Sequence, residues 1–203
     1  MDSVFFEPWV GGEYWSGRMF GKRIMVLGES HYCGSGCPDC GVGDRCRGFT
    51  TKVIKDYLDP NVKREEWMNT FKKFERSLVN RSTSPQESVR IWNSVMFYNF
   101  LQVAMGGPRQ AGTDEQYRNA AGAFFSVLDK YEPDLVIAWG DQLWGKLPWE
   151  RWTEGEALMV DGYEVNNGYY RLASGRQARV ICVYHPSTGY SWDFWHKVIA
   201  EVL

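Results

Sequence analysis

Two short polar segments follow apolar runs and contain side chains suited to acid–base chemistry. The first is GESHY at residues 28–32, where Glu29 offers a carboxylate and His31 an imidazole. The second is YHPS at residues 184–187, where His185 offers a second imidazole and Ser187 a hydroxyl. Proteins use carboxylates and imidazoles to activate water and to donate protons. We therefore expect a catalytic or ligand-binding site that includes both segments.

The cysteines gather in one glycine-rich segment at residues 33–48. Four of the five lie there, namely Cys33, Cys37, Cys40 and Cys46. Because structural disulfides are rare in the cytosol, where we expect this chain to be, a bound metal explains the cluster better. Four thiolates can close a tetrahedron around zinc and give a loop a fixed shape. An iron–sulfur cluster and free or redox-active thiols are the alternatives. Cys182, within an apolar run, is expected to be a small core residue.

The spacing Cys-x3-Cys-x2-Cys of the first three cysteines also resembles that of radical S-adenosylmethionine enzymes. Two features argue against this class. Asp39 stands where that family has an aromatic residue, and 203 residues offer too few strand–helix units for its partial barrel. We keep it as a remote alternative.

Three apolar runs predict the buried strands that position the polar segments. They cover residues 23–28, 134–140 and 179–184. Apolar spacing and capping residues predict helices in five other segments. These cover residues 50–58, 64–79, 113–131, 141–147 and 192–203. Strands that alternate with helices indicate an α/β fold.

Two further segments are less regular. Residues 91–104 form an apolar run that is compatible with a central strand or with a buried helix. Residues 157–173 predict a small hairpin, because Asp161-Gly162 and Asn167-Gly168 are dipeptides that favour tight turns.

The predicted elements favour a three-layer α/β/α fold with a mostly parallel central sheet, in which ligands bind at the carboxyl ends of the strands. We expect Gly28 and Tyr184 to end neighbouring parallel strands. Glu29 and His185 would then stand on opposite walls of one cleft.

Length and composition set limits on the class of protein. A chain of 203 residues predicts a single domain, with the cysteine-rich loop at residues 33–48 as an insertion. No run approaches the length of a membrane span, so we expect a cytoplasmic protein without a membrane partner. The net charge of −2 gives no overall basic excess of the kind that proteins use to grip DNA phosphates. Aromatic residues are abundant at 16%, with ten Trp, and some of them could line a pocket.

Five short segments occur in an order that resembles the uracil-DNA glycosylase superfamily. They are VLGESHY, RGFTTKV, VMFYNFLQ, PDLVIAWG and VYHPST, and together they extend over residues 23–190. No single segment is specific, but the ordered set is moderately so. The resemblance implies a uracil-DNA glycosylase-like α/β fold that binds a nucleobase flipped out of DNA.

The resemblance also implies a role for each motif residue. His185 would donate a hydrogen bond to a carbonyl oxygen of the leaving base, and Asn99 would read its Watson–Crick edge. Phe49 would stack on the base and Tyr32 would wall the pocket. Ser187 falls where the family grips a phosphate, and Tyr190 lies near the tip of the loop that the family inserts into the duplex.

The motif residues also have structural interpretations. His185 could cap a turn, Asn99 could be a satisfied core amide, and the aromatic rings could simply pack. Two departures from the family pattern bear on activity. Ser30 replaces an acid or amide that active members often have, so water activation would fall to Glu29 or His31. The cysteine-rich loop is longer than the family's.

These observations lead to two functional hypotheses. The first is a DNA glycosylase-like protein that binds, and hydrolytically excises, a uracil-type or modified base, with catalytic residues His185 and Glu29. Its substrate-binding residues would be Ser30, Tyr32, Phe49, Asn99 and Ser187. The second is a non-catalytic module that binds a nucleobase or nucleotide on the same fold. Either protein would have DNA or a nucleobase-containing ligand as its partner, and no obligate protein partner is inferred.

Overall fold

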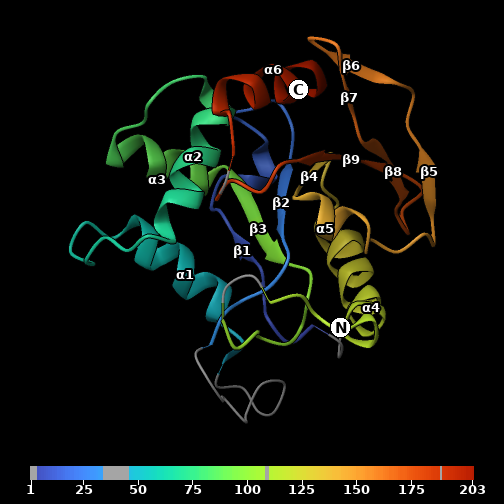
Figure 1. Cartoon of the computed structure of the whole chain (residues 1–203), viewed down its shortest axis with the longest axis horizontal. Helices are drawn as coiled ribbons and strands as arrows, with labels where there is room; N and C mark the ends of the chain where they lie inside the picture. Colours follow the sequence, from blue (N-terminus) through green and yellow to red (C-terminus); the bar gives the residue numbers. More distant parts are fainter. Residues whose placement is uncertain (1–3, 34–45, 108–109, 188) are drawn as a thin grey trace.

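A mixed sheet forms the centre of the computed structural model, which describes residues 4–33, 46–107, 110–187 and 189–203 (Figure 1). Within these residues the sheet has seven strands in the order β1-β3-β2-β4-β9-β8-β5. Their bounds are β1 Trp9–Val10, β2 Ile24–Gly28, β3 Val95–Asn99, β4 Leu135–Trp139, β5 Trp152–Glu154, β8 Asn167–Arg171 and β9 Gln177–Val183. The four central strands β3, β2, β4 and β9 are parallel, whereas the outer pairings are antiparallel.

The central strands form because their sequences are continuously apolar. Every residue of β2, β3 and β4 is buried, as expected for parallel strands covered on both faces. The three predicted strands are confirmed. The ambiguous run at residues 91–104 contains both kinds of element, since α3 (Pro85–Asn93) ends just before β3 begins.

The helices are α1 Phe49–Leu58, α2 Met68–Val79, α3, α4 Asp114–Tyr131, α5 Asp141–Trp144 and α6 Trp192–Val202. The five predicted helices are present, although α2 begins at Met68 rather than at residue 64. Thr113 caps α4 as its N-cap, in a capping box with Gln116. A similar box, Ser84 with Glu87, begins α3, and Pro85 occupies its first turn.

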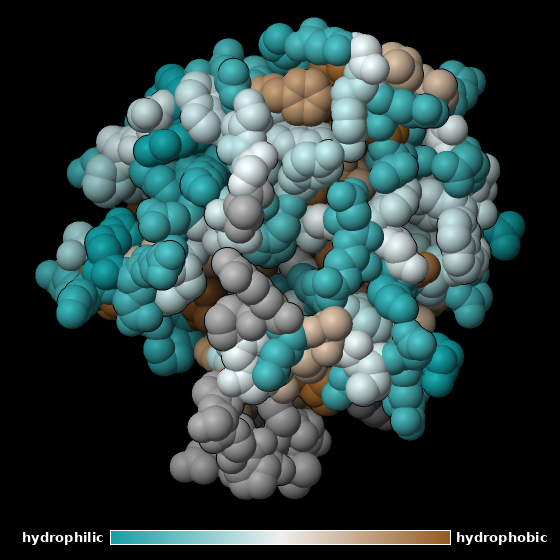
Figure 2. All heavy atoms as spheres, in the orientation of Figure 1, coloured by the Kyte–Doolittle hydropathy of each residue, from teal (hydrophilic) through white to brown (hydrophobic). Residues whose placement is uncertain are grey.

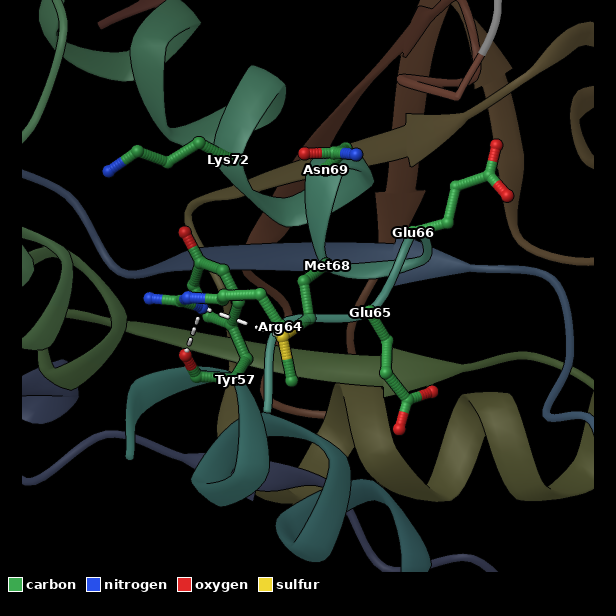
Figure 3. A pocket seen from close by; sticks show the side chains of 7 residues that line it. All are labelled: Tyr57, Arg64, Glu65, Glu66, Met68, Asn69 and Lys72. Atoms are coloured by element: carbon green, nitrogen blue, oxygen red, sulfur yellow. Dashed lines mark hydrogen bonds between the residues drawn. The ribbon is translucent and has the colours of Figure 1, made fainter. Parts of the chain in front are cut away.

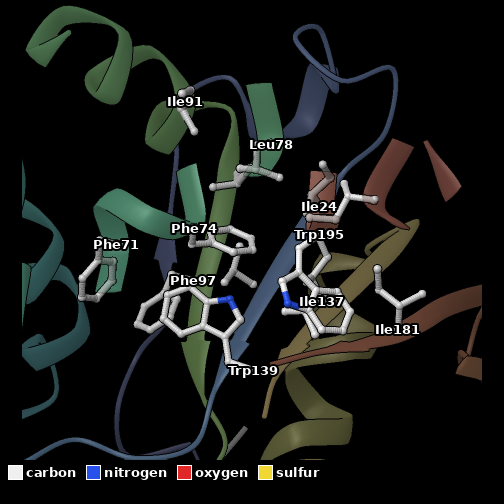
Figure 4. Close-up of a cluster of buried hydrophobic side chains, with 14 of the residues drawn as sticks. Ile24, Phe71, Phe74, Leu78, Ile91, Phe97, Ile137, Trp139, Ile181 and Trp195 are labelled. Atoms are coloured by element: carbon white, nitrogen blue, oxygen red, sulfur yellow. The ribbon is translucent and has the colours of Figure 1, made fainter. Parts of the chain in front are cut away.

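Side chains alternate along the strands into two buried clusters, one on each face of the sheet. Ile24 and Val26 of β2 join a cluster with residues of α1, α2, α3 and α6, part of which is drawn in Figure 4. Met25 and Leu27 face the other cluster, which contains residues of α4 and α5. The fold class is therefore mixed α/β with a mostly parallel central sheet, as predicted.

The predicted hairpin is confirmed at one turn and wrong at the other. Strands β6 (Leu158–Val160) and β7 (Tyr163–Val165) pair across Asp161 and Gly162, both of which have positive φ. Asn167 and Gly168 instead lie inside β8. Glycine is required there because a Cβ at Gly168 would come within 2.2 Å of the Trp152 ring. The dipeptide therefore marks a close approach, not a turn.

The surface is largely polar. Figure 2 shows hydrophilic residues over most of one face, with apolar residues exposed only in small areas. Across the described part of the chain, no helix combines the length and apolarity needed to cross a membrane.

Candidate functional site

A pocket of about 800 Å³ opens at the carboxyl ends of the four parallel strands. All seven residues predicted to act on or bind a substrate line it. They are Glu29, Ser30, Tyr32, Phe49, Asn99, His185 and Ser187. Segments far apart in the sequence thus meet where ligands bind in sheets of this kind.

The predicted adjacency of the two motif strands is wrong, because β4 lies between β2 and β9. Both loops still reach one pocket, and the residue after β4 explains how. The Gly140 amide donates to the Val183 carbonyl oxygen at 2.7 Å, and a Cβ at Gly140 would lie 3.3 Å from that of His185. Gly140 also has a φ of 97°, so glycine both permits this turn and leaves room for the histidine.

The described hydrogen bonds of His185 use only one of its two ring nitrogens. Its Nδ1 lies 2.8 Å from the Ser187 hydroxyl and accepts the Ser187 backbone N–H at 3.3 Å. Since Nδ1 is an acceptor, the proton of the neutral ring is on Nε2. Although the side chain is exposed at the pocket, desolvation lowers its pKa, so the ring is neutral at pH 7. His185 thus offers an Nε2–H donor.

Glu29 is oriented by two neutral donors. Its Oε1 accepts hydrogen bonds from the Tyr117 hydroxyl and from Gln142 Nε2, the latter at 2.8 Å. Burial, followed by the hydrogen bond to Glu29, raises the pKa of Tyr117 to about 12, so the phenol keeps its proton. A carboxylate with fixed orientation, and with no cationic partner among the described residues, is suited to accept a proton from water.

His31 is unsuited to water activation, which corrects one of the two alternatives drawn from the sequence. The ring is 4% exposed, and its Nε2 lies 2.9 Å from Thr50 Oγ1. Its Nδ1 lies 3.1 Å from Asn99 Nδ2, an amide nitrogen that can only donate. Both ring nitrogens are therefore occupied. Burial lowers the pKa of His31 to about 3, which keeps the ring neutral.

Asn99 and Phe49 are both engaged with His31. The Asn99 amide is held by the imidazole, and its Oδ1 is packed so closely over Gly28 that a Cβ there would lie 2.2 Å away. Phe49 stacks on His31 with ring centroids 4.6 Å apart and an interplanar angle of 21°. One face of Phe49 is thus covered, and base stacking would have to use the other. Phe6 packs edge-on against His31 with centroids 4.9 Å apart, which closes the back of this cluster.

The loop after His185 differs from the expectation at Tyr190. This residue is buried, with its hydroxyl 2.7 Å from Ser77 Oγ and its ring stacked on Trp195. A side chain held in this way is not available to enter a duplex. Ser187, by contrast, is exposed, and Lys73 Nζ donates to its carbonyl oxygen at 3.2 Å.

Several lining residues were not predicted from the sequence, notably Trp139, Asp141 and Gln142. A signal for them was present, since Gly140-Asp141-Gln142 comes at the carboxyl end of β4 as Gly28-Glu29-Ser30 comes at that of β2. Cys182 is buried as predicted, and its thiol contacts Asp141 Oδ1 at 3.6 Å.

The cysteine cluster is described only in part. Cys33 and Cys46 are half-buried, whereas Cys37 and Cys40 lie outside the described residues. Among the described residues, no group of three or more His, Cys, Asp or Glu side chains could hold a metal. The four-cysteine zinc site and its iron–sulfur alternative stay predictions.

A second pocket, of about 450 Å³, lies beside α2 (Figure 3). Its cations are already occupied. Arg64 donates to the Tyr57 carbonyl oxygen at 2.9 Å, and Lys72 bonds Thr83 and the buried Glu75. Glu65 and Glu66 point away from Arg64 in Figure 3. These contacts serve the fold, so the pocket at the strand ends is the stronger candidate.

Comparison with models of known protein families finds none that matches this chain, and comparison with curated proteins finds no significantly similar sequence.

Proposed function

We propose that this protein has a three-layer α/β/α, uracil-DNA glycosylase-like fold and that it hydrolyses the bond between a uracil-type or modified nucleobase and deoxyribose in DNA. The observation that carries the proposal is the single pocket lined by Glu29, Asn99 and His185. These residues belong to three different motif segments. Glu29 and His185 each have a chemical group that base excision needs, and Asn99 lines the pocket with its amide held by His31.

His185 supports the departure of the base. A base leaving with the bonding electrons develops negative charge on its ring and its carbonyl oxygen. The Nε2–H of a neutral imidazole can donate to that oxygen, and Ser187 fixes the ring through Nδ1. Lys73, bonded to the Ser187 carbonyl, adds a positive charge where a flanking phosphate would lie.

Glu29 supports the attack of water. Tyr117 and Gln142 orient its carboxylate, so it can take a proton from a water that attacks the sugar. This assignment compensates for Ser30, which lacks the carboxylate or amide found in related motifs. His31 has no part in proton transfer, since both of its nitrogens are occupied.

A non-catalytic nucleobase-binding module is the second candidate. The observation that favours it is the absence of Lys and Arg among the described residues that line the pocket. Such a lining suits a free base or nucleoside better than a phosphate-rich strand.

The deciding experiment is incubation with oligonucleotides that carry uracil or other modified bases, followed by alkali to cleave abasic sites. An enzyme releases base from at least one of them, and Glu29→Gln lowers turnover by about 10²-fold with little change in affinity. A binding module has no turnover with any oligonucleotide, which would reject the hydrolase. Glu201→Gln, which makes the same charge change outside the pocket, is the matched control.

A further inference from the structure

The described lining of the pocket combines aromatic rings with carboxylates. Its aromatic residues are Tyr32, Phe49, Trp67, Phe71, Phe97, Trp139 and Tyr184. Its carboxylates are Glu29, Asp56, Glu65 and Asp141. Rings of this kind attract cations to their faces, and carboxylates add direct Coulomb attraction.

Three of the carboxylates have only neutral hydrogen-bond donors as partners in the described chain. Glu29 accepts from Tyr117 and Gln142, Glu65 accepts from Trp67 Nε1 at 2.9 Å, and Asp141 accepts from the Cys182 thiol. The described lysines near the pocket are held elsewhere or at its rim. Lys52 is paired with Asp56, Lys146 is paired with Asp114, and Lys73 lies at the rim on the Ser187 carbonyl.

The two histidines add no positive charge. Desolvation lowers the pKa of both His31 and His185, so both rings are neutral at pH 7. Among the described lining residues, negative charge therefore predominates. A phosphate group would be repelled from the interior of the pocket, away from Lys73 at the rim, whereas a positively charged ligand would be attracted.

The ligand that fits is an organic cation, not a metal ion. Within the described residues, the carboxylates do not gather into a group that could hold a metal. The wall also offers a hydrogen-bond donor, the Nε2–H of His185, whose ring is held through Nδ1 by Ser187. A flat, positively charged ring with a carbonyl oxygen would use the aromatic faces, the carboxylates and this donor together.

We propose that the pocket selects a cationic, N-alkylated nucleobase over the neutral parent base. This inference rests on the proposed function, because it names the substrate class of the same site. This substrate class also explains how the protein could act with Ser30 in place of an acid or amide. A base that is already positive leaves as a neutral molecule, so its departure needs less assistance than that of uracil.

The reaction is balanced without any further reagent. The bond between the base nitrogen and the sugar C1′ breaks, and its electron pair returns to the base, which becomes neutral. Water bonds through its oxygen to C1′ and gives a proton to Glu29. The products are the free alkylated base and an abasic sugar.

The test measures binding by the full chain through its tryptophan fluorescence at pH 6.5. The probes are N7-methylguanosine, which is cationic, and O6-methylguanosine, which has the same methyl group without the charge. Guanosine is the unmethylated reference, and choline is a cation without a base. We expect N7-methylguanosine to bind about tenfold more tightly than either neutral nucleoside.

Variants assign the preference to the pocket. Glu29→Gln and Asp141→Asn should each reduce it severalfold, whereas Glu201→Gln should leave it unchanged. Equal affinity for the three nucleosides would overturn the inference. Choline binding as tight as that of N7-methylguanosine would also overturn it. Base release from oligonucleotides is measured separately. Release of neutral bases, without a binding preference for the cationic nucleoside, would contradict only this inference. A binding preference for the cationic nucleoside, without release of any base, would contradict only the proposed hydrolysis.

Discussion

The two pocket histidines have the same side chain in opposite environments. His31 is buried, with one nitrogen on Thr50, the other on Asn99, and Phe49 stacked on its face. His185 is exposed to the pocket, and its described contacts with Ser187 use Nδ1 alone. A ring with both nitrogens occupied, like His31, stabilises the fold and has no group left for a ligand. A ring held at one nitrogen is fixed in direction and still has a donor for a ligand.

The largest effect should come from removing the available donor. We expect His185→Ala to slow base release by about 10²–10³, or ~2.7–4 kcal/mol, because a preorganised donor to the leaving base is lost. Single-turnover kinetics on the best oligonucleotide measures this. His196→Ala is the matched control, since that histidine lies on α6 outside the pocket. Unchanged release by His185→Ala would mean that the two histidines do not differ as described.

The pH dependence of stability should come mainly from His31. Its pKa in the folded protein is about 3, below the ordinary value of 6.5, so only the unfolded chain takes up the proton between these values. The contribution of His31 to the free energy of unfolding is therefore greatest above pH 6.5. It falls by roughly 1.4 kcal/mol for each pH unit as the pH drops from 6.5 towards 3. Urea titrations between pH 4 and 7 measure the slope.

His31→Gln should flatten that slope, because glutamine does not titrate. His185→Gln should flatten it less, since its lowered pKa comes from a more exposed site. If the two variants changed the slope equally, burial would not distinguish the two histidines.

The smallest effect concerns the cysteine-rich loop, which connects the His31 motif to Phe49. If this loop binds zinc, purified protein should contain one metal ion per chain, and Cys37→Ser should release it. We expect the melting temperature to fall by about 2–4 °C, as for a loss of about 1 kcal/mol in a chain of this size. Elemental analysis and thermal melts measure both. Metal-free protein with four freely titratable thiols, prepared under reducing conditions, would rule the site out.

The parts of the fold that depend on local pattern were predictable. Continuous apolar runs gave β2, β4 and β9, and Thr113 marked the start of α4. Helix α3 was missed although its signal was present, because Ser84-Pro85 followed by Glu87 is a capping box. The more prominent signal was the apolar run that follows, which contains β3.

The lining of the pocket was predicted better than the contacts within it. Motif order brought Glu29, Asn99 and His185 to one place. The burial of His31 could not be read from the sequence, because it depends on Phe6 and Asn99, which are distant along the chain. The insertion of β4 between β2 and β9 likewise follows from how the strands cross, and pattern alone does not specify that order.

The hydrogen-bonded series Thr50–His31–Asn99 has a consequence for how this sequence can vary. Each member is buried and depends on the next for a partner, so changing one leaves a polar group unpaired, whereas changing all three together need not. We therefore expect these three positions to covary among relatives. An alignment in which Thr50, His31 and Asn99 change independently would contradict this.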